Sequence, residues 1–389
     1  MIDPVYLIWI MPAEGIMIKF INSNIKNSSD RLSVLVNLCS ISQLIKPICI
    51  TFFTIIFFIG CTNVSDSTLR IITHDSFEIN QSVIQQFETD NNVQIEIQKA
   101  GDAGEVIVRA ILEKGNPSAD LLYGIDNTFL GRALDEQLFI AYKSPFLSLV
   151  PKNLLIDSSH HVTPVSYGFV MINYDREYLN NHQLTLPLSL EDLTNEEWKG
   201  KLVVENPSTS SPGLTFLLAT ISYFGVDDEY DYLDFWSDLK DNEVVVKDGW
   251  TAAYYTEFSK NGGSIPLVVS YSTSPAAEVY YSEGKYTEPP TGNLDLPGAS
   301  FLQIEGIGIL KGTTKEKLAQ KFIDYTLQEG FQEDIPLNMW VYPINMKADL
   351  PDVFKYANPP KHQVSLDPKL ISKNREKWID NWSKVILNR

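Results

Sequence analysis

The chain has 389 residues, of which 44% are hydrophobic and 21% charged, so it is long enough for two or three domain-sized units with buried cores. Its formal net charge of -18 argues against nucleic acid and anionic lipid as partners, and is compatible with cationic ligands or with solubility alone. All three cysteines (Cys39, Cys49 and Cys61) lie near the start, which excludes a disulfide, a thiolate metal site and a cysteine nucleophile from the rest of the chain.

The N-terminal region carries an export signal. Residues 47–59 form an uncharged apolar run that is short for a transmembrane helix but suits the apolar core of a signal peptide. The run ends in Phe-Ile-Gly-Cys, which resembles the lipobox of bacterial and archaeal lipoproteins and would make Cys61 the lipidated residue. We therefore predict a signal peptide and lipobox in 1–61 and a polar tether in 62–68. An uncleaved membrane anchor is the alternative, and both place the remaining chain outside the cytoplasm.

The segment after the tether alternates between strand and helix. Period-two and β-branched runs predict strands at 69–73, 93–97 and 119–123, and apolar spacing predicts helices around 83–87 and at 106–112. Strands that alternate with helices through short connections favour a mostly parallel sheet with helices on both faces.

A second α/β unit begins near Val165. Its predicted strands are 201–204, 243–246 and 265–270, and its predicted helices are 214–221, 251–258 and the segment from 367 to the C-terminus. The fold class is therefore α/β.

Polar loops follow two strands of the first unit. His74, Asp75 and Ser76 come after one strand, and Asp126 with Asn127 after another. Because ligands bind outside the carboxyl ends of strands in open α/β sheets, these loops are candidates for a binding site. The two aspartates could meet a cation or an aminopyrimidine through charge-assisted hydrogen bonds. Helix capping is the alternative role.

A serine-rich turn joins a strand to a helix in the second unit. Its candidate ligand-binding residues are Ser208, Ser210, Ser211 and Gly213. Free N–H groups and hydroxyls at a helix N-terminus can cradle a phosphate or carboxylate. Ordinary capping by serine is the alternative.

Aromatic residues gather in the loops that follow strands. Trp250, Tyr254, Tyr271, Trp340 and Tyr342 could stack on a flat heterocycle or contact a cation, at roughly 0.5–2 kcal/mol for each cation–π contact. Packing in the core is the alternative for each of them.

Two other patterns have weaker interpretations. The pairs 254–255 and 280–281 are doubled tyrosines, which could ligate ferric iron. The pair His160-His161 lacks a partner at metal-ligand spacing, so we expect a solvated loop there.

The chain from residue 69 onward resembles the thiamine-binding periplasmic proteins of ABC importers. The resemblance is carried, in order, by the motifs Asp-Ser-Phe at 75–77, Gly-Ile-Asp-Asn at 124–127, Ser-Thr-Ser-Ser-Pro-Gly at 208–213, Lys-Asp-Gly-Trp at 247–250, Ser-Tyr-Ser-Thr-Ser-Pro-Ala at 270–276 and Ile-Pro-Leu-Asn-Met-Trp-Val-Tyr-Pro at 335–343. It implies a type II periplasmic binding protein fold, in which two doubly wound lobes are joined by a hinge. We expect lobe 1 in 69–165 plus 270–330 and lobe 2 in 166–269 plus 331–389. The expected crossovers between lobes are 164–173 and 265–275.

The same resemblance implies a binding protein that captures thiamine or a thiamine phosphate between its lobes and delivers it to an ABC permease. It implies a monomer without a cofactor, a metal or an enzymatic activity. In this family the pyrimidine stacks on aromatic side chains and serine hydroxyls hold the phosphate end. Matching by motif, Trp250, Tyr271 and Trp340 take aromatic cleft positions, while Asp75, Asp126, Ser210 and Ser211 take polar ones. The full expected set is His74, Asp75, Ser76, Asp126, Asn127, Ser208, Ser210, Ser211, Gly213, Trp250, Tyr254, Tyr271, Thr273, Ser274, Trp340 and Tyr342.

Two residues depart from the family pattern. His74 stands where a tyrosine is common, and Ala277 where an aromatic residue is common, so one stacking face could be lost unless Tyr280 or Tyr281 replaces it. A ferric-ion or polyamine carrier is the rival binding function, and a structural surface lipoprotein is a further alternative. A thiaminase-like enzyme would need a cysteine nucleophile, and no cysteine follows Cys61.

Overall fold

A computed structural model describes residues 67–364, 366 and 368–387. The predicted signal peptide, the lipobox with Cys61 and the tether up to residue 66 lie outside the described residues. The folded part begins with β1 (Thr68–Thr73), one residue before the predicted strand. None of the described helices combines the length and apolar character needed to cross a membrane.

Two groups of parallel strands define two lobes. Lobe 1 holds β2 (Gln94–Lys99), β1 and β3 (Leu121–Asp126), in that spatial order. Lobe 2 holds β8 (Leu267–Tyr271), β6 (Leu202–Glu205) and β7 (Val245–Lys247). Strands β3 and β6 are wholly buried, as expected of strands covered on both faces.

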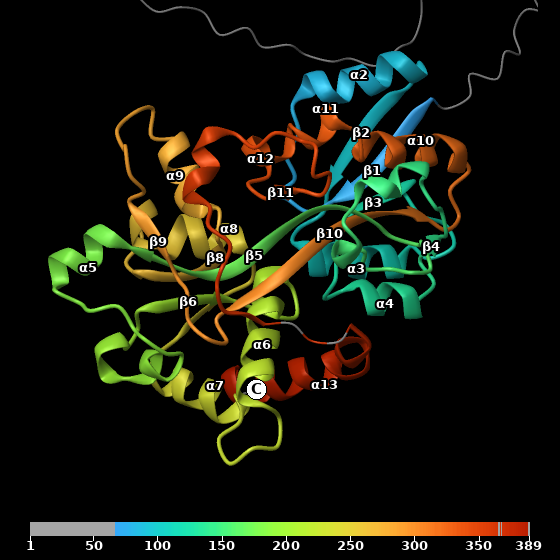
Figure 1. Ribbon diagram of the computed structural model, residues 1–389. Helices are drawn as coiled ribbons and strands as arrows, with labels where there is room; N and C mark the ends of the chain where they lie inside the picture. Colours follow the sequence, from blue (N-terminus) through green and yellow to red (C-terminus); the bar gives the residue numbers. More distant parts are fainter. Residues whose placement is uncertain (1–66, 365, 367, 388–389) are drawn as a thin grey trace, which may run out of the picture. The chain divides into compact units, whose positions relative to one another are not determined.

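Two long antiparallel strands join the lobes. They are β5 (Thr163–Asp175) and β10 (Ser300–Leu310), which pair with each other and cross the middle of Figure 1. β10 also pairs with β3, and β5 with β8. The predicted α/β class, the two lobes and the hinge between them are therefore confirmed.

One of the two expected crossovers coincides with a strand that joins the lobes, and the other does not. Residues 164–173 lie in β5, but 265–275 overlap β8, whose pairing with β6 keeps it in lobe 2. The second crossing strand is β10. Likewise β9 (Thr291–Leu294) pairs with β5 at Ile172–Asp175, although the expected division assigned it to lobe 1. The same division put 274–280 in lobe 1 and 331–338 in lobe 2, whereas 274–280 contacts β9, and Ile335 packs with residues of β1 and β3. We propose that the lobes divide within β5 and β10.

Helices cover the strands of each lobe. Lobe 1 carries α2 (Gln81–Asn91), α3 (Ala103–Leu112), α4 (Leu130–Asp135), α10 (Glu316–Thr326), α11 (Glu329–Gln332) and α12 (Ile335–Asn338). Lobe 2 carries α5 (Arg176–His182), α6 (Ser211–Phe224), α7 (Tyr232–Asp241), α8 (Trp250–Ala252) and α9 (Ser274–Tyr280). Short strands complete the sheet: β4 (Phe139–Ile140), β11 (Tyr342–Pro343) and β12 (Gln363–Val364). The helix predicted at 251–258 is α8 followed by a π-helical turn, Ala253–Glu257.

The C-terminal helix α13 (Pro368–Ile386) contacts both lobes. Its Trp382 is fully buried and meets Trp236 of α7 edge-on, with ring centroids 5.6 Å apart. On the other side, the Ser372 hydroxyl donates a hydrogen bond of 3.0 Å to Asp135 of α4. The predicted C-terminal helix is present, and it ties α7 to α4.

Candidate binding cleft

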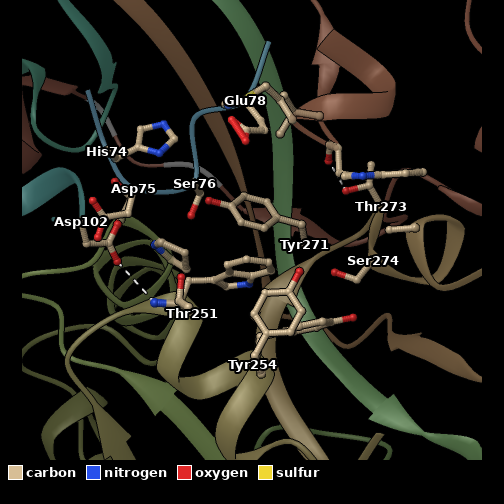
Figure 2. A pocket seen from close by; sticks show the side chains of 18 of the residues that line it. His74, Asp75, Ser76, Glu78, Asp102, Thr251, Tyr254, Tyr271, Thr273 and Ser274 are labelled. Atoms are coloured by element: carbon tan, nitrogen blue, oxygen red, sulfur yellow. Dashed lines mark hydrogen bonds between the residues drawn. The ribbon is translucent and has the colours of Figure 1, made fainter. Parts of the chain in front are cut away.

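A cavity of about 620 Å³ lies between the lobes, within the usual range for small-molecule sites. The described residues that line it include ten of those expected from the sequence: His74, Asp75, Ser76, Ser211, Trp250, Tyr254, Tyr271, Thr273, Ser274 and Trp340. Figure 2 shows His74, Asp75 and Asp102 on one side of this space and Tyr271 and Tyr254 on another. The cavity thus combines the loops at strand ends from both lobes.

His74 is buried at the end of β1 and faces a carboxylate. Its Nε2 lies 3.3 Å from Oε1 of Glu305. Burial alone would lower the pKa of His74, but the carboxylates of Glu305, Asp102 and Asp126 together outweigh that effect and raise the pKa above its usual value. Gly124 makes room for the ring, because a Cβ there would lie 2.4 Å from Cδ2 of His74. Its φ of +94° also favours glycine.

The sequence interpretation missed Asp102, which lines the cleft at the N-terminus of α3. Asp102 and Glu105 form a capping box, so α3 begins at Ala103, earlier than the predicted residue 106. The Asp102 carboxylate also accepts a 3.4 Å hydrogen bond from the backbone N–H of Trp250 in lobe 2, and burial raises its pKa. The pattern Asp-x-x-Glu before an apolar helix was the signal that could have located it.

The charge of the cleft is predominantly negative. Its described lining includes five carboxylates, Asp75, Glu78, Asp102, Glu278 and Glu305, and a single lysine, Lys99. That lysine lies 3.4 Å from Glu78, and so is partly neutralised. Such a lining attracts a cation and repels an anion.

Aromatic rings form the lobe 2 wall. Trp250 stacks on Tyr254 with centroids 5.0 Å apart and an interplanar angle of 18°. The Trp250 indole N–H donates to the Ser270 hydroxyl at 2.9 Å, and the Tyr254 hydroxyl to Glu278 at 2.9 Å. These bonds fix both rings, so the wall is preorganised to stack on a flat ligand.

Tyr271 joins this wall to the hinge. Its hydroxyl donates to the Gln303 side chain at 3.2 Å, and the Gln303 amide donates to Asp126 at 3.1 Å. Burial raises the pKa of the Tyr271 hydroxyl well above its usual value, so the hydroxyl stays a neutral donor.

Six expected site residues do not line the cleft: Asp126, Asn127, Ser208, Ser210, Gly213 and Tyr342. Asp126 is fully buried and accepts hydrogen bonds from Thr128 and Phe129, which caps the loop after β3. The Asn127 amide donates to the Leu302 carbonyl at 3.1 Å, and thereby ties β10 to that loop. The polar atoms of Asp126 and Asn127 are thus engaged by the protein itself, so these two side chains hold the loop after β3 in place and do not contact a ligand directly.

Tyr342, Ser208 and Gly213 also make contacts within the protein that explain their positions. The Tyr342 hydroxyl donates to the Ala357 carbonyl, and its ring stacks on Tyr167 at 5.2 Å. The Ser208 hydroxyl donates to Asn206 at 2.7 Å. Gly213 packs so closely on β6 that a Cβ would lie 2.3 Å from the Glu205 carbonyl oxygen.

The serine-rich turn reaches the cleft through one serine. Ser211 lines it with Pro212, at the N-terminus of α6. The hydroxyls of Ser210 and Ser211 are buried, and each interacts with a carboxylate, that of Asp102 and that of Asp126 respectively. Of these two predicted ligand-holding serines, Ser211 lines the cleft and Ser210 does not.

The predicted pair His160 and His161 does not belong to a group of potential metal ligands in the described part of the chain. Among residues 67–364, 366 and 368–387, no group of three or more His, Cys, Asp or Glu is arranged to hold a metal ion. His161 is hydrogen-bonded to Ser159 at 2.8 Å within its own loop.

The fold and the ligand-sized interlobe cleft define a class, the two-lobed type II solute-binding proteins. Residues 116–362 match the model of the bacterial extracellular solute-binding protein family, and the chain belongs to this family. This is a family of binding proteins that act outside the cytoplasm, as the sequence predicted.

Several relatives carry a more specific description. The thiamine-binding periplasmic protein of Salmonella typhimurium is 29% identical over 322 residues, which cover 82% of this chain and 93% of the relative. That of Brucella suis is 30% identical over 321 residues, which cover 81% and 91%. A solved periplasmic thiamin binding protein superposes with a TM-score of 0.72 at 27% identity and covers 82% of this chain and 96% of that structure. The resemblance inferred from the sequence motifs is confirmed.

Proposed function

We propose that this protein captures thiamine in the interlobe cleft and delivers it to the permease of an ABC importer. The observation that carries the proposal is the wall formed by Trp250 and Tyr254, which faces a cleft whose charged side chains are mostly carboxylates. A flat, positively charged heterocycle can stack on these rings while the carboxylates stabilise its charge. The relatives named for thiamine binding support the same ligand.

A calorimetric titration of the purified protein tests this function. The ligands are thiamine, its monophosphate and diphosphate, ferric citrate and spermidine. We expect saturable heat with thiamine. Tight binding of ferric citrate or spermidine alone would overturn the thiamine assignment and leave a solute-binding role in place.

A thiamine phosphate is the second candidate ligand. It is favoured by the position of Ser211, which lines the cleft at the N-terminus of α6, where free N–H groups attract a phosphate. The carboxylate-rich lining opposes it. Tighter binding of a phosphate form than of thiamine, lost in Ser211→Ala, would establish this ligand.

We further propose that the protein acts as a monomer anchored by lipid on Cys61, without enzymatic activity. Labelled fatty acid should be incorporated into the wild type and not into Cys61→Ser, in which the uncleaved apolar run 47–59 still holds the chain at the membrane. A wild type that takes up no label and stays in the membrane fraction would favour an uncleaved anchor instead.

A further inference from the structure

Tyr281 follows the last residue of α9 and lies at the mouth of the cleft. Its side chain is among the most exposed large apolar ones described, at 63% exposure, yet it lines the cavity. Its hydroxyl accepts a hydrogen bond from the indole N–H of Trp340 at 3.1 Å and donates one to the Leu337 carbonyl at 3.3 Å. One hydroxyl thus contacts the 337–340 segment twice.

These contacts connect opposite sides of the cleft. α9 follows β8 of lobe 2. The α12 segment is held to lobe 1, because the backbone N–H of Glu78 donates to the Met339 sulfur at 3.0 Å and that of Asn80 to Asp334 at 2.8 Å. Tyr281 is therefore a bridge from lobe 2 to a segment that is fixed on lobe 1.

Trp340, the partner of Tyr281, has a strained backbone. Its φ is +54°, in the left-handed region that bulky residues rarely adopt. Four neighbours hold it: the Thr273 hydroxyl donates to its carbonyl, its ring stacks on Phe354 at 5.9 Å with an 8° interplanar angle, the Tyr280 ring lies 5.5 Å away, and Tyr281 accepts from its indole. The Tyr281 hydroxyl thus fixes the N–H edge of the indole.

The ring of Tyr281 has a second effect. Ala277, one helical turn earlier, presents only a methyl group to the cleft, and its carbonyl accepts the Tyr281 backbone N–H at 2.9 Å. The Tyr281 ring lies 5.5 Å from that of Trp340, so the two rings share the wall at this end.

We propose that Tyr281 is a positioning residue that latches the mouth of the cleft, orients the Trp340 indole over a bound cationic ring and so sets the residence time of the ligand. The proposal rests on the proposed function for the identity of that ligand. The Tyr281 hydroxyl makes the contacts that hold the mouth of the cleft, and the Tyr281 ring forms part of its wall. A substitution that removes only the hydroxyl therefore separates the first effect from the second.

The test compares three variants of the full chain. Tyr281→Phe removes only the hydroxyl, Tyr281→Ala removes the ring as well, and Tyr230→Phe is a matched control whose hydroxyl donates to Asp238 at 2.8 Å outside the cleft lining. The rate of thiamine dissociation is measured by stopped-flow displacement. Equilibrium affinity and the unfolding temperature are measured in parallel.

We expect dissociation to become about three- to tenfold faster in Tyr281→Phe, from the loss of one or two net hydrogen bonds, with the association rate and unfolding temperature changing little. Tyr281→Ala should dissociate faster still, and Tyr230→Phe should match the wild type. A wild-type dissociation rate in Tyr281→Phe would overturn the latch. If the wild type binds ferric citrate or spermidine instead of thiamine, the thiamine function fails, and the same rate comparison with that ligand decides the latch separately.

Discussion

Trp250 is fixed in the cleft by its bond to Ser270 and its stacking on Tyr254. Its replacement should therefore remove a preorganised binding surface. We expect Trp250→Ala to weaken thiamine binding by more than about 1 kcal/mol, from the loss of stacking and cation–π contact. Calorimetric dissociation constants measure the effect, and Trp250→Phe, which retains a ring, should lose less. Unchanged affinity in Trp250→Ala would return Trp250 to a purely structural role.

At the same scale, the His74–Glu305 pair predicts a pH dependence of stability. The folded-state pKa of His74 is raised above its usual value of about 6.5, because Glu305, Asp102 and Asp126 outweigh the effect of burial. Protonated His74 therefore stabilises the fold at pH values below that usual pKa, and this contribution is lost as the pH rises through the folded-state pKa. The stability advantage of the wild type over His74→Asn, measured by urea unfolding, should shrink as the pH rises from below the usual pKa of about 6.5 through the raised folded-state pKa. An advantage that grows over this range would contradict the assignment.

Single residues also mark the limit of the sequence prediction. Asp75 and Asp126 both follow a parallel strand, and only their neighbours distinguish them. Asp75 lines the cleft, whereas Asp126 is covered by Gln303, a residue 177 positions away. No local pattern contains that contact, so the sequence could place both aspartates at a strand end without showing which one faces the ligand.

At the scale of elements, α3 of lobe 1 touches the serine-rich turn of lobe 2. The Gly104 N–H donates to the Thr209 carbonyl at 2.9 Å, and a Cβ at Gly104 would lie 2.5 Å from that oxygen. Alanine favours a helix by about 1 kcal/mol over glycine, so Gly104→Ala should not weaken α3 itself. It should push the lobes apart and weaken ligand binding by about five- to 150-fold, because relieving the overlap costs about 1–3 kcal/mol.

The matched control for this contact is Gly330→Ala in α11, where a Cβ would meet nothing within 4 Å. Small-angle scattering should report a more open molecule for Gly104→Ala and an unchanged one for Gly330→Ala. Equal affinities in the two variants would show that the α3 contact plays no part in closure.

Elements also differ in how far the sequence predicts them. The strands of both lobes follow from their apolar and alternating runs, and all six predicted strand segments overlap observed ones. These runs do not indicate which strands cross between the lobes, because the strands that pair with one another are distant in sequence. β10 lies between β3 and β5, more than 120 residues from either, and only tertiary packing selects it over β8.

At the scale of the whole molecule, α13 joins α7 to α4 through Trp382 and Ser372. Trp382 is fully buried, so Trp382→Ala should lower the free energy of unfolding by about 3–5 kcal/mol. Trp382→Phe should cost less, since it refills part of the cavity. Urea unfolding followed by circular dichroism measures both, and a loss under about 1 kcal/mol in Trp382→Ala would show that α13 contributes little to the packing.

The contact between Gly104 and Thr209 joins backbone to backbone, and a backbone cannot rotate out of the way as a side chain can. It therefore acts as a mechanical stop at which the approach of the lobes ends, whatever is enclosed. The lobes cannot close further around a ligand that is smaller than the space left at that point. Such a ligand leaves a gap, and the atoms that line the gap lose dispersion contacts. We expect selection against undersized solutes to come from this stop, while the aromatic wall and the carboxylates select for shape and charge.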